Sequence, residues 1–113
     1  MKERRQFPRA SQPFTVQCRN YGLVGESWQL VQSVNLGAGG MRFISQQLHE
    51  VGSLLELRLQ LPNAEAPLAL RARLAWTKTM ASGLIANGVE FMDTTPEQRA
   101  QVDALVEFLG QAA

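Results

Sequence analysis

The sequence has little of several residue types that carry chemistry in small proteins. Its 113 residues include one cysteine, one histidine and one tyrosine, and aromatic residues make up 7% of the chain. A single cysteine excludes an internal disulfide and fits a reducing compartment. No stretch approaches the roughly 20 apolar residues of a membrane-spanning helix, and no apolar core follows the basic first residues as in a signal peptide. We therefore expect a cytoplasmic protein without membrane insertion.

The residues that are present do not form a recognisable catalytic set. Histidine, cysteine and the carboxylates show no metal-ligand spacing. His49 lies in the polar segment QQLHEVG and is expected to be solvated. Cys18 falls on the apolar face of a predicted strand, as a small core residue does. We predict that the protein is not an enzyme and holds no metal or cofactor.

Charge is distributed unevenly along the chain. Hydrophobic residues make up 45% and charged residues 19%, which is typical of one globular domain of this length, and the net charge is +1. Residues 1–9 carry four cations and one carboxylate, whereas the remainder carries more carboxylates than cations. This asymmetry indicates an anionic partner for the N-terminal segment.

Alternation of apolar and polar residues predicts strands along most of the chain. In SLLELRLQL, residues 53–61, four leucines face one way, and the next run, residues 68–76, has its apolar face end at Trp76. A turn at Pro62 and Asn63 joins these runs into a hairpin. Further strands are expected near residues 13–20, 27–34 (with Trp28 on the apolar face), 40–44 and 83–92. Six short strands predict an antiparallel barrel or sandwich.

The C-terminal residues change to a helical period. Thr95-Pro96-Glu97-Gln98 has the pattern of a capping box with proline at the first helical position. Four apolar residues then follow at helical spacing, namely Val102, Leu105, Val106 and Leu109. We predict a helix over residues 95–110, ended by Gly110 and packed on the barrel by this apolar stripe.

Two segments have compositions that a plain strand or turn does not require. RRQFPR, residues 4–9, is extended or turned because Pro8 disfavours helix at Phe7. Arginine forks suit phosphate oxygens and the O6/N7 edge of guanine, although a solvated basic tail also fits. NLGAGG, residues 35–40, is either a tight turn or a backbone that another group can approach closely. Trp76 is either a core residue or a stacking surface at the barrel mouth.

The first of these segments resembles a motif of the PilZ domain family. The family's RxxxR motif fits RQFPR, with Arg5 and Arg9 as its two arginines and Arg4 as the frequent additional arginine. The resemblance extends over nearly the whole chain through VGSLLELRLQLP, LRARLAW and NGVEF.

The second segment resembles the family's other motif, [D/N]xSxxG. It fits at Asn35 and Gly40 but has Gly37 where serine is expected. The lost hydroxyl removes one hydrogen bond, worth about 0.5–1.5 kcal/mol, or up to about tenfold in affinity.

Similarity to this family implies a mainly β fold, a six-stranded antiparallel β-barrel with a C-terminal α-helix, that binds cyclic di-GMP. Residues 1–12 would be a flexible basic segment and residues 13–113 the barrel. By this resemblance the arginines grip guanine edges and phosphates, and Asn35 with its glycine-rich neighbours meets the other guanine. With the stacking alternative for Trp76, the expected ligand-binding residues are Arg4, Arg5, Arg9, Asn35, Gly37, Gly40 and Trp76.

The retained arginines favour a working receptor that changes its N-terminal loop on binding cyclic di-GMP and signals to a protein partner. The alternative is an adaptor of the same fold with weak or lost nucleotide binding that acts through protein contacts. A barrel for single-stranded nucleic acid would need aromatic platforms and a broad basic groove. The composition supplies neither, so we expect no DNA or RNA partner.

Overall fold

Six antiparallel strands close into a barrel, and a seventh short strand lies along one of them. The computed structural model describes residues 9–10, 14–22, 27–62 and 64–111. Within them the elements are β1 (Arg9–Ala10), β2 (Phe14–Asn20), β3 (Gln29–Gly37), β4 (Gly40–Ser45), β5 (Leu54–Leu59), β6 (Leu68–Thr79), β7 (Ile85–Met92) and α1 (Pro96–Gln111). The strand order β3-β2-β5-β6-β7-β4 returns to β3 through the β3–β4 pairing, so the predicted barrel is confirmed.

The apolar face of each predicted strand fills the barrel. On β5, Leu55, Leu57 and Leu59 are fully buried, while the residues between them reach the surface. Cys18 is a buried core residue as expected. Burying an aliphatic side chain contributes about 1.5–3 kcal/mol, so this alternation fixes which face of each strand is free for binding.

The C-terminal helix begins at the predicted capping box. The Thr95 hydroxyl accepts a hydrogen bond from the Gln98 backbone N–H at 3.1 Å, and the Gln98 side-chain oxygen accepts one from the Thr95 N–H at 2.9 Å. The stripe from Val102 to Leu109 is buried. The helix runs to Gln111, so the predicted stop at Gly110 is wrong.

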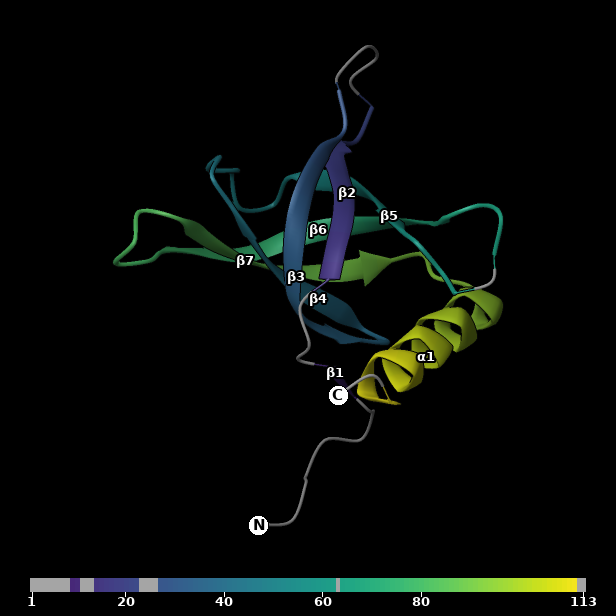
Figure 1. The fold of residues 1–113 in the computed structure, drawn as a ribbon. Coiled ribbons are helices and arrows are strands. Elements are labelled where there is room, and N and C mark those ends of the chain that lie inside the picture. Colours follow the sequence, from purple (N-terminus) through teal and green to yellow (C-terminus); the bar gives the residue numbers. More distant parts are fainter. Residues whose placement is uncertain (1–8, 11–13, 23–26, 63, 112–113) are drawn as a thin grey trace.

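Helix α1 covers one end of the barrel and lies next to β1 and β3 (Figure 1). Its burial on the strands explains why the helix continues past Gly110, since packing overrides the weak helix propensity of one glycine. Within the part of the chain that the structure describes, no helix is long and apolar enough to cross a bilayer.

Candidate functional site

The pairing of β1 with β3 brings the two sequence motifs together. Arg9 pairs with Gly37 and Ala10 with Leu36, although the motifs are more than 25 residues apart in sequence. Leu36 also pairs with Met41 of β4, so β1 runs along the opposite edge of β3, the edge that β2 uses farther along. The second arginine of RxxxR therefore lies beside the third position of the other motif. Arg4 and Arg5 lie outside the described residues.

The NLGAGG segment is a β-hairpin and not a longer loop. Asn35 to Gly37 belong to β3, Gly40 begins β4, and only Ala38 and Gly39 form the turn. The carbonyl oxygen of Gly39 accepts a hydrogen bond from the Phe91 N–H of β7 at 3.0 Å, which fixes the turn against the barrel.

Gly40 has a packing role, because its missing side chain lets the backbone of another strand come close. The glycine-rich sequence had indicated such a close approach. A Cβ at this position would overlap the carbonyl oxygen of Val89 on β7. Neither Gly39 nor Gly40 takes a left-handed φ, so conformational freedom is not what these two positions require. Gly40 allows β4 to approach β7 and thereby supports the face on which Asn35 lies.

Trp76 lies on the outer face of the barrel, so its assignment to the inward face is wrong. The register of β6 against β7 shifts between Leu74 and Trp76, which a β-bulge at Ala75 explains. Leu74 is buried, whereas Trp76 is 41% exposed and pairs with Gly88. A Cβ at Gly88 would overlap the Trp76 indole, so the absent side chain makes room for the ring. This exposure of the ring supports the interpretation of Trp76 as a stacking surface.

Arg42 belongs to a row of paired residues that crosses four strands, and it was not identified as a site residue from the sequence. It pairs with Asn35 of β3 on one side and with Gly88 of β7 on the other, and Gly88 in turn pairs with Trp76. Residues directly opposite one another in a ladder share a face, so Asn35, Arg42 and Trp76 line one outer surface. The signal was available in the hairpin register, because a two-residue turn at residues 38–39 places residue 42 opposite residue 35.

The neighbouring charges on this face are already partly balanced. Glu90 lies two residues along β7 from Gly88, and its carboxylate accepts a hydrogen bond from the Arg73 guanidinium at 3.1 Å. Arg42 is exposed, and its guanidinium carbon lies 5.6 Å from the centre of the Trp76 ring. The surface therefore offers a guanidinium, an amide and an indole face, which suit a planar ligand with hydrogen-bond acceptors and negative charge.

A second arginine–tryptophan cluster lies on a different part of the barrel surface. Trp28, just before β3, is half-buried under Arg19 and Arg58, whose guanidinium carbons lie 4.2 and 4.0 Å from its ring centre. Arg19 also pairs with Glu56 at 3.2 Å. The expectation that Trp28 lies on the apolar face of its strand is wrong, because this tryptophan packs beneath surface arginines.

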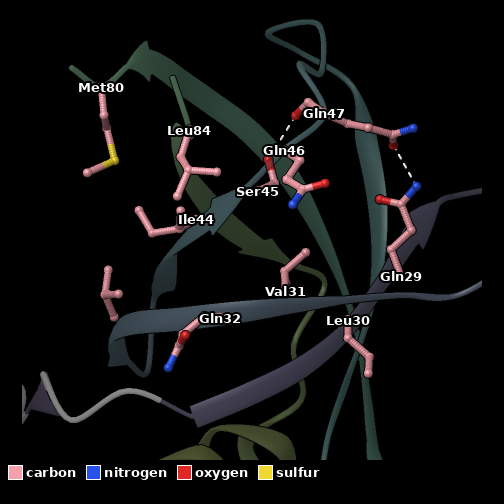
Figure 2. A pocket seen from close by; sticks show the side chains of 11 residues that line it. Gln29, Leu30, Val31, Gln32, Ile44, Ser45, Gln46, Gln47, Met80 and Leu84 are labelled. Carbon is pink, nitrogen blue, oxygen red and sulfur yellow. Dashed lines mark hydrogen bonds between the residues drawn. The ribbon is translucent and has the colours of Figure 1, made fainter. Parts of the chain in front are cut away.

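One groove of the barrel is unsuited to an anionic ligand. Figure 2 shows it between β3, β4 and the β6–β7 turn, with Leu30, Ile44, Met80 and Leu84 among its side chains. The residues that line it are uncharged throughout, and its polar groups include glutamines such as Gln29. A doubly negative ligand would find no cation among these described lining residues, so the Asn35–Arg42–Trp76 row is the better candidate. His49, which was expected to be solvated, is instead half-buried in the β4–β5 connection.

Comparisons with known proteins agree with this architecture. A family model described as the PilZ domain matches residues 3–108, whereas a comparison with curated proteins gives no match. The PilZ domain of YcgR from Escherichia coli, solved with c-di-GMP, is similar at a TM-score of 0.69 and 16% identity, over 97% of this chain and 94% of that chain.

Two further solved structures have similar folds. The PilZ domain of CeSA from a cellulose-synthesizing bacterium has a TM-score of 0.67 and 18% identity, over 90% of this chain and 97% of that one. The Bacillus subtilis inhibitor of motility MotI has a TM-score of 0.70 and 20% identity, over 98% of this chain and 52% of that one. The chain thus spans about half the length of MotI, and at such identities the likeness establishes the fold.

Proposed function

The chain belongs to the PilZ domain family, and we propose that it is a receptor that binds cyclic di-GMP on the outer face of β3 and β4. The observation that carries this proposal is the pairing of β1 with β3, which sets the backbone of Arg9 opposite Gly37. One ligand can then touch both motifs at once. The fold is also similar to that of the YcgR domain, which was solved with c-di-GMP.

The chemistry of the ligand suits the groups near this pairing. Cyclic di-GMP carries two phosphates and two guanines, and arginine forks bind both phosphate oxygens and the O6/N7 edge of guanine. We assign these contacts to Arg4, Arg5 and Arg9. Asn35 supplies an amide for the second guanine, and Trp76 supplies a face for stacking, which contributes about 1–3 kcal/mol for a base.

Two glycines of the second motif, Gly37 and Gly40, have different roles in this proposal. Gly37 occupies the position of the motif serine, on the same side of β3 as Asn35, so the ligand lacks one hydroxyl contact there. Gly40 acts indirectly, through the close approach of β4 to β7. Binding is therefore weakened at Gly37 without being abolished, since the charged contacts remain.

The N-terminal segment acts as the switch of this receptor. A short terminus rich in cations and poor in apolar residues does not offset its own ordering entropy, and charge-assisted contacts to the ligand supply the difference. The pairing of Arg9 and Ala10 with β3 already places part of residues 1–12 on the barrel. Ligand binding then closes the rest of this segment over the barrel, residues 13–113, and forms a new surface for a protein partner. We place this signalling in the cytoplasm, where the single cysteine stays reduced.

Calorimetric titration with cyclic di-GMP tests the proposal. We expect saturable binding to the wild-type protein and its loss in a variant carrying both Arg5→Ala and Arg9→Ala, with thermal unfolding showing that the variant is folded. Absence of binding to the folded wild-type protein would contradict the receptor and leave the alternative, an adaptor of the PilZ fold that acts through protein contacts alone.

A further inference from the structure

The Arg42 side chain lies over the Trp76 ring, but farther from it than the arginines that cover Trp28. Its guanidinium carbon is 5.6 Å from the ring centre, near the outer limit of about 6 Å for a cation–π contact, whereas the two arginines over Trp28 lie at 4.2 and 4.0 Å. Among the residues that the structure describes, no carboxylate forms an ion pair with Arg42. The arginine therefore keeps hydrogen-bond donor capacity beside a tryptophan that is 41% exposed.

The strands hold Arg42 and Trp76 in fixed relation. Gly88 of β7 lies between them in the ladder, pairing with Arg42 on one edge and with Trp76 on the other. The indole lies over the position that a Gly88 side chain would occupy. The ring thus packs on the backbone of β7. Both Arg42 and Trp76 belong to paired strands and not to a loop.

We propose that Arg42 is a specificity-determining residue that reads the O6/N7 edge of the guanine stacked on Trp76. This inference rests on the proposed function and adds the recognition of the base to it. A guanidinium donates two parallel hydrogen bonds to guanine O6 and N7, whereas adenine presents a donor, its N6 amino group, at the position of O6. The contact with Arg42 therefore favours guanine and disfavours adenine.

The test compares cyclic di-GMP with cyclic di-AMP on three folded proteins. Wild type, Arg42→Met and Arg58→Met are titrated with each nucleotide by calorimetry. A bidentate arginine–guanine contact discriminates between bases by about fivefold to more than a hundredfold. We expect Arg42→Met to bind cyclic di-GMP at least fivefold more weakly and cyclic di-AMP almost unchanged. Arg58→Met, which removes an arginine from over Trp28, should leave both affinities as in wild type.

A second variant and an optical signal keep the test independent of one substitution. Arg42→Gln replaces Met if that variant unfolds, because it keeps a polar side chain but not the fork. With Trp28→Phe, Trp76 is the remaining tryptophan of the chain, and stacking of guanine should quench its fluorescence.

The outcomes separate this inference from the receptor proposal. If wild type binds no cyclic di-GMP, the proposed function fails and Arg42 fails with it. If wild type binds but Arg42→Met behaves like Arg58→Met, only the role of Arg42 is overturned. An equal loss for both nucleotides would also overturn it, because it would indicate a phosphate contact. Unchanged Trp76 fluorescence on binding would exclude the stacked base.

Discussion

The two tryptophans of the barrel surface have arginine neighbours in opposite states. Trp28 is half-buried, its two arginines lie about 4 Å from its ring centre, and Arg19 is paired with Glu56 at 3.2 Å. Trp76 is 41% exposed, and the one arginine over it among the described residues, Arg42, lies 5.6 Å from its ring centre. The Trp28 cluster, whose ring is covered by two arginines and whose Arg19 is paired with Glu56, stabilises the protein surface. The more exposed Trp76 ring, with Arg42 at a longer distance, has surface and hydrogen-bond donors that a ligand can contact.

The largest difference is expected from removing an arginine in each region. Arg9→Ala should weaken cyclic di-GMP binding by about 2 kcal/mol or more, because a charge-assisted contact is lost, and leave the free energy of unfolding nearly unchanged. Arg58→Ala should do the reverse, with unchanged affinity and a loss of about 0.5–1 kcal/mol of stability from the lost cation–π contact. Calorimetry and urea unfolding of both variants measure these quantities. A stability loss in Arg9→Ala with intact binding would make Arg9 structural.

A smaller and more local effect is expected from the tryptophans themselves. Trp76→Ala should cost about 1–3 kcal/mol of binding, as the loss of a stacking platform does. Trp28→Ala should leave binding unchanged and lower stability, because the two arginines that pack on this ring in the wild-type protein lose that contact. The same titrations and unfolding curves apply. If the two variants exchange these effects, the open and covered clusters have been assigned the wrong roles.

The smallest effect concerns the motif position that departs from its family. Gly37→Ser should tighten cyclic di-GMP binding several-fold, because it restores a hydroxyl that can hydrogen-bond the ligand. Trp28→Phe, far from this motif in the register, serves as a control with unchanged affinity. Weaker binding by Gly37→Ser would show that residue 37 does not occupy the serine position.

The sequence predicted the barrel because alternation and capping are local patterns. The leucines of residues 53–61 and the reciprocal bonds of Thr95 and Gln98 depend on neighbours within a few positions. The orientation of Trp76 was wrong because one bulge, at the register shift after Leu74, inverts the face of every later residue in the strand. Periodicity alone contains no sign of that inversion.

The candidate site was predicted in part, for a related physical reason. The motifs supplied Arg9 and Asn35, whereas the pairing of β1 with β3 that joins them follows from tertiary contacts. Arg42 belongs to neither motif. Its place in the site follows from the residues that pair with it on the neighbouring strands, Asn35 and Gly88. A composite surface of this kind requires the strand register, which the sequence specifies only through the completed barrel.

Amide hydrogen exchange with and without cyclic di-GMP is the most direct test of binding at the paired motifs. We expect the ligand to slow exchange in residues 1–12 and in the hairpin of residues 35–42, and to leave the segments around Trp28 and Arg58 unchanged. The slowing should disappear in Arg9→Ala. Equal exchange in both states over residues 1–12 and 35–42, or protection centred on Trp28, would contradict the account.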